Sequence, residues 1–232
     1  YDGDGKMDLA VFRRGTGDWF IKRSSDGAVT TKLWGLGTDT PVPGDYDGDG
    51  RTDIAVWRGA DTTWYIIPSS DGQTQTVSWG TSRAPYFDVP VPADYDGDGK
   101  TDIAVFRQAN GHWYIRLSAG NEIVDKAWGL GSDVPVAADF DGDGRADIAV
   151  WRGAEMNWYV LRSSDGKVQT ISLSAVGSDE TPVAGDFDGD GKADAALWRE
   201  KDGRWTIKSS RDNSVRVRIH GQTGDHPVAI GR

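Results

Sequence analysis

The chain has 232 residues, including 31 Gly, 11 Trp and no Cys, and its formal net charge is −10. This length suits one large domain or two small ones. The acidity argues against binding to nucleic acid or to an anionic membrane, since both need a basic face, and no apolar run approaches the roughly 20 residues of a membrane span. Without Cys, the chain has no disulfide, thiolate metal site or Cys nucleophile.

Five repeats run through the chain. The string Asp-Gly-Asp-Gly followed by Lys or Arg starts at Asp2, Asp47, Asp96, Asp141 and Asp188. In each repeat this acidic loop leads into an apolar run that ends in an aromatic residue and Arg, at 8–13, 53–58, 102–107, 147–152 and 194–199. A second aromatic segment follows, around Trp19, Trp64, Trp113, Trp158 and Trp205. A third segment ends in Trp-Gly in three repeats, and a Pro-Val step leads to the next acidic loop.

Each repeat therefore predicts four short β-strands. The segments are rich in Val, Ile, Trp and Tyr and are separated by Gly, Asp, Ser and Asn, a composition typical of strands and turns. No segment has a sustained 3.6-residue apolar period, so we expect almost no helix. The acidic loops start 45 to 49 residues apart, and four strands at this period predict one blade of a β-propeller per repeat. A β-solenoid is the main alternative, although its repeats are usually shorter.

The two ends of the chain predict a closed ring. The first repeat lacks the Pro-Val strand, and residues 227–232 supply one. We predict an all-β, five-bladed propeller of four-stranded antiparallel blades, closed by pairing the C-terminal strand with the N-terminal blade. Its single domain, 1–232, divides into blades at 227–232 with 1–40, 41–89, 90–134, 135–181 and 182–226. The alternative is a fragment of a longer propeller.

The acidic loop has the residues of a calcium site. In the second loop, carboxylates occupy loop positions 1, 3, 5 and 9, Gly at position 6 permits a sharp turn, and the carbonyl of position 7 can point inward. This number of hard oxygen ligands suits Ca²⁺, which takes 6 to 8 oxygens, better than Mg²⁺. The predicted ligands are Asp2, Asp4, Lys6 and Asp8; Asp45, Asp47, Asp49, Arg51 and Asp53; Asp94, Asp96, Asp98, Lys100 and Asp102; Asp139, Asp141, Asp143, Arg145 and Asp147; and Asp186, Asp188, Asp190, Lys192 and Asp194.

We predict up to five Ca²⁺ ions. Nothing in the chain fills position 1 of the first loop, so we expect that site to be weaker or to be completed by an upstream residue. An EF-hand needs a bidentate Glu at position 12 and flanking helices, but position 12 is Val or Leu in every repeat, which excludes it. Solvated hairpin turns do not explain five copies, because closely spaced carboxylates repel one another unless a cation lies among them.

The loop Asp-x-Asp-x-Asp-Gly-x-x-Asp between two strands resembles the FG-GAP/VCBS repeats of integrin α-subunit propellers and of many secreted bacterial proteins. The resemblance covers essentially the whole chain and implies calcium at the rim of the ring and an extracellular or cell-surface location. The literal Phe-Gly and Gly-Ala-Pro strings are absent, and integrin propellers have seven longer blades, so integrin-type partner binding is not implied. Related propellers include lectins and some polysaccharide lyases.

Repeated Trp and Arg residues have both a packing and a binding interpretation. We expect the Trp residues of the second and third strands to pack between blades. For Trp34, Trp79 and Trp128, on the outer strand, packing is the first interpretation and carbohydrate contact the second. The five Arg residues that end the apolar runs are expected to stack on a ring or pair with a loop Asp, in preference to contacting an acidic ligand.

The sequence does not favour an enzyme. The three His residues occupy no repeated position, no nucleophile elbow, phosphate loop or His metal pair occurs, and near-equal blades offer no obvious unique pocket. We expect a monomeric, non-catalytic, extracellular propeller that acts as a binding or scaffold module for a carbohydrate or protein ligand. The alternatives are a lectin with repeated carbohydrate sites and an accessory domain of a carbohydrate-active enzyme; a stand-alone enzyme is least favoured.

Overall fold

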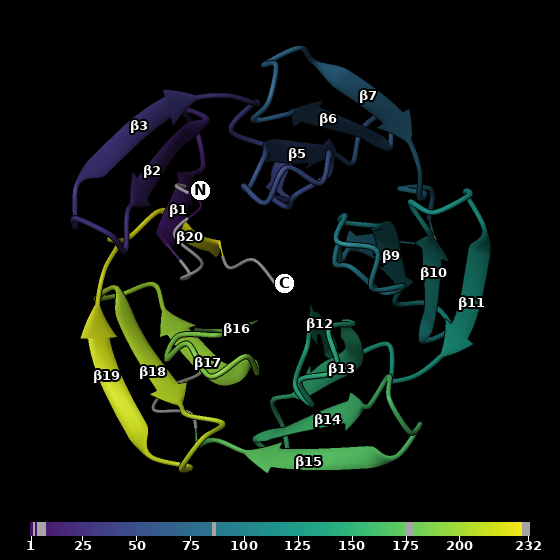
Figure 1. Cartoon of the computed structure of the whole chain (residues 1–232), viewed down its shortest axis with the longest axis vertical. Coiled ribbons are helices and arrows are strands. Elements are labelled where there is room, and N and C mark those ends of the chain that lie inside the picture. Colours follow the sequence, from purple (N-terminus) through teal and green to yellow (C-terminus); the bar gives the residue numbers. More distant parts are fainter. Residues whose placement is uncertain (2, 4–7, 85–86, 175–178, 229–232) are drawn as a thin grey trace.

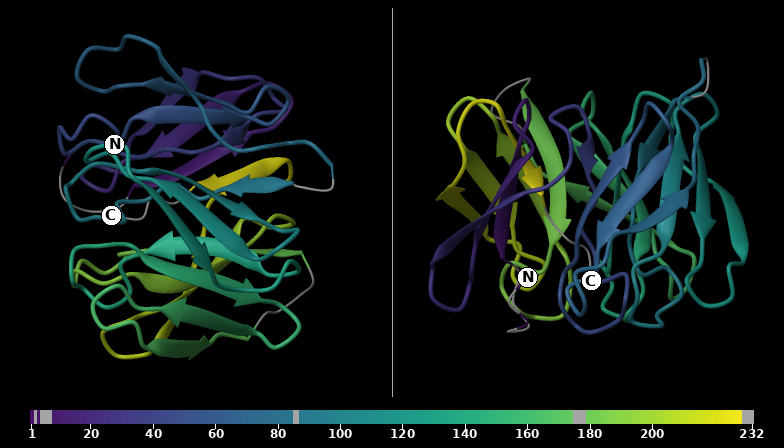
Figure 2. Two further views of the ribbon diagram at one scale, coloured as in Figure 1. Left: turned by 90° about the vertical axis from the view of Figure 1, so that its right-hand side faces the viewer. Right: turned by 90° about the horizontal axis from the view of Figure 1, so that it is seen from above.

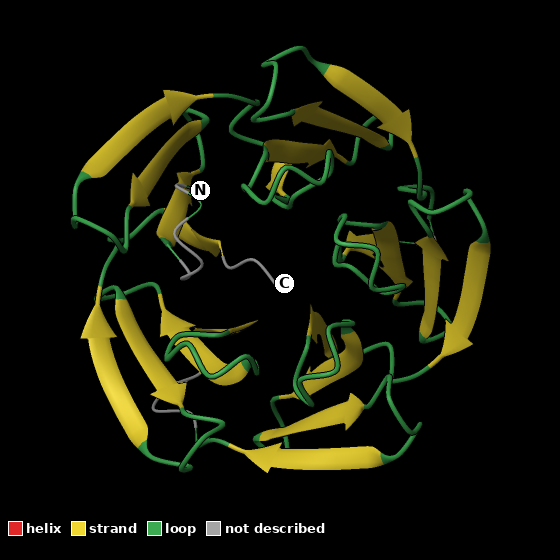
Figure 3. Cartoon of the chain, viewed as in Figure 1, coloured by secondary structure: helices red, strands yellow, loops and turns green. Residues whose placement is uncertain are grey.

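The computed structural model describes residues 1, 3, 8–84, 87–174 and 179–228, and this part of the chain consists of strands and loops without a helix (Figure 3). Five four-stranded antiparallel sheets surround a central axis, as Figure 1 shows along that axis and Figure 2 from two sides. The predicted all-β, five-bladed propeller is confirmed.

Each blade runs from an inner strand to an outer strand. Blade 1 has β20 (Asp225–Val228), β1 (Leu9–Arg13), β2 (Asp18–Lys22) and β3 (Val29–Leu33); blade 2 has β4 (Thr40–Pro41), β5 (Ile54–Arg58), β6 (Thr63–Ile67) and β7 (Gln75–Ser78); blade 3 has β8 (Asp88–Pro90), β9 (Ile103–Arg107), β10 (His112–Arg116) and β11 (Ile123–Ala127); blade 4 has β12 (Val134–Ala138), β13 (Asp147–Arg152), β14 (Asn157–Leu161) and β15 (Val168–Ser172); and blade 5 has β16 (Glu180–Gly185), β17 (Asp194–Arg199), β18 (Arg204–Lys208) and β19 (Val215–Ile219).

The last strand closes the ring. β20 pairs antiparallel with β1, with Ala10 opposite Val228 and Arg13 opposite Asp225. Blade 1 is therefore built from both ends of the described chain, as predicted. The pairing satisfies the backbone groups of an edge that would otherwise be open to another chain.

The core lies in the gaps between blades. The repeated Trp residues of the third strands are almost completely buried: Trp19, Trp64, Trp113, Trp158 and Trp205. One face of each blade packs on the next blade, as Trp57 and Trp64 of blade 2 do with Ile103 and Val105 of blade 3. The middle strands are covered on both faces, which explains why their sequences are continuous apolar runs. The predicted interblade packing is confirmed for Trp19, Trp64, Trp113 and Trp158, whose clusters include residues of the next blade.

Candidate metal centres

The acidic loops of blades 2 to 5 each join the inner strand of the blade to its second strand, so they gather at one end of the ring. Residues from these loops line a shared central funnel of about 500 Å³. The position 6 glycines have φ angles between +80° and +87°, at Gly50, Gly99, Gly144 and Gly191. This left-handed conformation favours Gly, which agrees with the sharp turn expected from the sequence.

Three carboxylates converge in each of four loops. One oxygen from position 1, one from position 3 and one from position 9 all lie within 4.8 Å of one another. The triads are Asp45, Asp47 and Asp53; Asp94, Asp96 and Asp102; Asp139, Asp141 and Asp147; and Asp186, Asp188 and Asp194. The structure thus brings together twelve of the predicted ligands in four groups. Oxygen ligands at this spacing suit a hard cation.

The position 9 carboxylate is the buried anchor of each loop. In blade 2, Asp53 accepts hydrogen bonds from the backbone N–H of Tyr46 (2.8 Å) and of Ser69 (2.6 Å). Ser69 belongs to the turn between the third and fourth strands, so one carboxylate fixes the acidic loop to a neighbouring turn. The same two bonds recur at Asp102, Asp147 and Asp194.

The position 5 carboxylates face serine hydroxyls. Asp49 accepts a hydrogen bond from the Ser69 hydroxyl at 2.6 Å and Asp98 accepts one from Ser118 at 2.8 Å. Asp143 and Asp190 have the same arrangement with Ser163 and Ser210. Their role as metal ligands stays a prediction. We had not assigned these serines a role, although three of the repeats carry a visible Ser-Ser-Asp-Gly turn at this point.

Burial and mutual repulsion raise the pKa of the position 9 carboxylates. Burial, together with the negative charge of Asp47, raises the pKa of Asp53 to about 6. Burial likewise raises the pKa of Asp102 and of Asp147 to about 6, with a neighbouring position 3 carboxylate adding to the effect. The hydrogen bonds from backbone N–H groups oppose these shifts but do not outweigh them. The carboxylates therefore lack a compensating positive charge.

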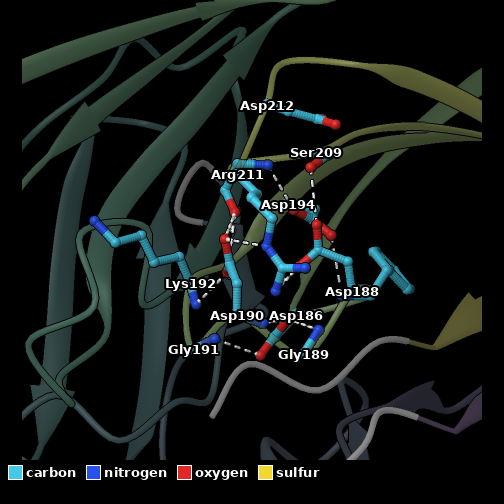
Figure 4. A network of polar contacts seen from close by, with 12 residues as sticks. Asp186, Asp188, Gly189, Asp190, Gly191, Lys192, Asp194, Ser209, Arg211 and Asp212 are labelled. Atoms are coloured by element: carbon cyan, nitrogen blue, oxygen red, sulfur yellow. Dashed lines mark hydrogen bonds and ion pairs between the residues drawn. The ribbon is translucent and has the colours of Figure 1, made fainter.

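Two departures from the repeat show what the site accepts. In blades 2 and 4, Ser70 and Ser164 donate to the position 3 carboxylates at 2.5 Å each. Blade 3 has Ala119 in place of this serine, and Oδ2 of its position 3 residue, Asp96, is buried without a hydrogen-bond partner among the described residues. Blade 5 has Arg211 there, and Figure 4 shows its guanidinium among the carboxylates, 3.5 Å from Asp188. A cation thus fits this donor set.

The first loop is described only in part. Asp8 is buried, accepts a hydrogen bond from the Ser24 N–H at 2.7 Å, and lies 3.1 Å from the amino group of Tyr1. The other predicted ligands of this loop, Asp2, Asp4 and Lys6, lie outside the described residues.

Neighbouring loops contact one another around the ring. The N–H at position 8 donates to the position 1 carbonyl of the preceding loop, from Thr101 to Asp45 at 2.6 Å, with equivalent bonds from Ala146 and Ala193. The position 7 side chains also reach back to the preceding loop. Arg51 lies close to Gly3, Lys100 to Gly48, Arg145 to Gly97 and Lys192 to Gly142. Ligation of Ca²⁺ by the backbone carbonyls of these position 7 residues stays a prediction.

At the far end of the blades, four Arg residues pair with buried aspartates. Arg58 makes two hydrogen bonds to Asp39, at 3.0 and 2.8 Å, and its guanidinium lies 4.4 Å from the centre of the Tyr65 ring. Arg107 and Arg152 make the same two hydrogen bonds, to Asp88 and Asp133, and Arg13 makes one, to Asp225. The predicted stacking is present in all four, whereas the paired Asp lies at or just before the start of the inner strand and is not in the acidic loop. We missed these aspartates, although each stands two residues before the repeated Pro.

The outer Trp residues reach from one blade to the next. Trp79 and Trp128 are half-buried, and their indole N–H groups donate to the carbonyls of Tyr114 (3.3 Å) and Tyr159 (3.1 Å) in the following blade. Trp34 is also half-buried and packs against the cluster that includes Val56 of blade 2. These contacts join blades; carbohydrate contact by the same residues stays a prediction.

Several solved structures share this fold. They include a protein of unknown function from Bacteroides caccae (11% identity, TM-score 0.52, covering 92% of this chain and 73% of that one). An auxiliary nutrient binding protein from Bacteroides ovatus is also similar (11% identity, TM-score 0.50, 94% of this chain and 62% of that one). A lectin from Agrocybe aegerita that recognises terminal N-acetylglucosamine has a TM-score of 0.48 at 14% identity, covering 94% of this chain and 77% of that one. At these identities the likeness shows the fold alone.

The described residues form no helix that could span a membrane. No curated protein sequence matches the chain significantly. The model of the FG-GAP-like repeat matches it at four overlapping segments, residues 1–56, 45–105, 94–150 and 139–197. Each segment begins at or within one acidic loop and ends in the second strand of the following blade. The chain belongs to the FG-GAP-like repeat family.

Proposed function

We propose that this chain is a non-catalytic, extracellular binding or scaffold module whose ring is stabilised by Ca²⁺ in the acidic loops. One observation carries the proposal: carboxylate oxygens converge within 4.8 Å in each of four loops. Such a group is unfavourable without a cation. Ca²⁺ accepts 6 to 8 oxygens in flexible geometry, whereas Mg²⁺ demands a strict octahedron and keeps several waters, so the loops suit Ca²⁺ better.

The triads and their surroundings would hold the ion, which supplies the positive charge that the loops lack. Asp45, Asp47 and Asp53 would be ligands in blade 2, with the equivalent residues in blades 3 to 5. Because Asp53 also fixes the turn at Ser69, restraint of the loop extends to the third and fourth strands of the blade. Metal binding of this kind is coupled to folding.

A non-catalytic role is supported by the distribution of reactive groups. His112 pairs with the exposed Asp125, His226 contacts Arg14, and His220 follows the outer strand of blade 5. Among the described residues, none of the three has a hydrogen bond to a hydroxyl that could act as a nucleophile, the pairing that covalent catalysis requires. We propose a monomer whose ligand is a carbohydrate or a protein.

Calorimetric titration of chelator-treated protein tests the metal assignment. We expect Ca²⁺ to bind with Kd of about 10⁻⁴–10⁻³ M, the range of extracellular modules, and Mg²⁺ to bind more weakly. Asp102→Asn removes one ligand of blade 3 and should reduce the number of calcium sites by one. Asp125→Asn, on the surface of the same blade, is the matched control and should leave the number unchanged. Absence of calcium binding at about 10 mM, well above that range, would contradict the proposal.

A further inference from the structure

The gap between blades 4 and 5 is filled differently from the other gaps. At the first apolar position of the second strand, blades 1 to 4 have Leu9, Ile54, Ile103 and Ile148, whereas blade 5 has Ala195. Ala195 lies on the face of blade 5 that packs against blade 4. A smaller side chain at this repeated position leaves space that its equivalents fill in the other gaps.

The gap between blades 4 and 5 also departs from the repeat at a second place. Blade 5 has Thr206 where blades 1 to 4 have Phe20, Tyr65, Tyr114 and Tyr159. Leu173 follows the outer strand of blade 4, where blades 1 to 3 have Trp. The Trp and Tyr pair of the earlier gaps is therefore replaced by Leu and Thr between blades 4 and 5.

A cavity of about 350 Å³ lies in this gap. We call it the blade 4–5 pocket. Ile171, Ala193 and Ala195 form its apolar wall. Its polar lining includes Arg162, Gln169, Lys192, Lys208, Ser210 and Asn213, with Asp141 at the blade 4 loop. The volume is in the range of small-molecule sites, roughly 300–1,000 Å³.

The pocket is cationic in an acidic protein. Three basic side chains line it against one carboxylate, although the chain has a net charge of −10. Lys208 Nζ donates to the backbone carbonyl of Ser172 at 2.9 Å, and neither Lys208 nor Lys192 forms an ion pair with a carboxylate in the described part of the chain. Arg162 is bound to Asp165. Both lysines therefore keep donors for an anion.

We propose that the blade 4–5 pocket binds a carboxylate-bearing sugar, a uronic acid residue. The two lysines would recognise the carboxylate as charge-assisted donors. Gln169 and Asn213 offer both donors and acceptors, the combination that sugar hydroxyls require. The proposal rests on the proposed function, because Asp141 and Lys192 belong to acidic loops whose carboxylates we take to be offset by Ca²⁺.

Titration with glucuronate and galacturonate in millimolar Ca²⁺ tests the proposal. Glucose, a sugar without a carboxylate, and acetate, a carboxylate without a sugar ring, are the comparison ligands. Ala195→Ile fills the pocket with the residue of blades 2 to 4 and should abolish uronate binding while keeping or raising the Tm. Lys208→Ile reproduces Ile67 of blade 2 and should weaken binding about tenfold or more, the worth of a charge-assisted hydrogen bond. Lys22→Ile, at the same position of blade 1 beside Leu9, is the matched control and should change nothing.

Four results would overturn the proposal. Uronate binding that survives Ala195→Ile would place the site elsewhere. Equal binding of glucose would remove the need for a carboxylate, and equal binding of acetate would reduce the pocket to an anion site. No uronate binding by protein whose Tm still rises with Ca²⁺ would refute the pocket and leave the proposed function standing, whereas loss of both responses would refute the proposed function as well.

Discussion

At the scale of the residue, two buried aspartates of blade 2 show opposite solutions to the burial of a charge. Asp39 is 2% exposed and is paired with Arg58 through two hydrogen bonds. Asp53 is completely buried and faces other carboxylates, and its pKa is about 6. The charge of Asp39 is offset by the Arg58 guanidinium, whereas the Asp53 triad would be offset by a bound metal ion. The same division recurs in blades 3 and 4.

Asp39→Asn tests the paired type. The change removes the charge of Asp39 and leaves Arg58 without its partner, so we expect the free energy of unfolding to fall by about 1.5–3 kcal/mol, the range for hydrogen bonds to charged groups. Asp202→Asn is the control, because Asp202 pairs with Arg199 in blade 5 but is 44% exposed, and should cost clearly less than Asp39→Asn because solvent screens an exposed pair. Chemical denaturation in Ca²⁺ measures both, and equal losses would contradict this interpretation.

The unpaired type predicts a pH dependence. The folded, metal-free protein binds protons at Asp53, Asp102 and Asp147 with pKa values of about 6, above the usual value of about 3.9. Lowering the pH through this window therefore stabilises the metal-free fold and, at the same time, removes ligands from the metal. The Tm difference between protein in Ca²⁺ and protein in EDTA should shrink as pH falls from 7 to 5. A constant or growing difference would show that these carboxylates do not bind the ion.

At the scale of the element, the acidic loops form a connected ring. Each described contact joins the position 8 backbone of one loop to the position 1 carbonyl of the loop before it. Beside each of these contacts, the residue before position 1 of one loop faces the position 8 side chain of the next loop, and the two are matched in size. Gly44 faces Thr101, whereas the equivalent pairs are Ala93 with Ala146 and Ala138 with Ala193.

This matching predicts a rescue. A Cβ at residue 44 would lie 2.5 Å from the Thr101 hydroxyl oxygen, so Gly44→Ala should destabilise the protein by about 1–3 kcal/mol, as overpacking does. Adding Thr101→Ala recreates the Ala and Ala pair of the following loop contacts and should recover most of the loss. A double-mutant cycle by chemical denaturation measures the coupling. Strictly additive effects would mean that the two loops do not press on each other.

At the scale of the whole molecule, the repeat made most of the fold predictable. The period, the strand-like segments and the complementary ends are local patterns, and together they specified five blades closed by β20 and β1. The triads were also predictable, because loop spacing alone brings Asp45, Asp47 and Asp53 together.

Contacts between repeats were harder to predict. The pairing of Arg58 with Asp39 spans 19 residues, and the serine partners of the loops come from a different hairpin. The blade 4–5 pocket does not follow from the features that the repeats share, because it depends on a side chain that is smaller in one repeat than in the others. Ala195 is that side chain, and only its difference from Leu9, Ile54, Ile103 and Ile148 indicates the pocket.

The most direct test of the account is thermal unfolding of one preparation in millimolar Ca²⁺ and in EDTA. We predict a clearly higher Tm in Ca²⁺, since millimolar Ca²⁺ at one to ten times Kd adds about 0.4–1.4 kcal/mol for each of several sites. We also expect the metal-free protein to regain this Tm when Ca²⁺ is restored. Equal Tm values in the two conditions, with removal of the metal verified, would contradict the central claim that cations in the acidic loops stabilise the ring.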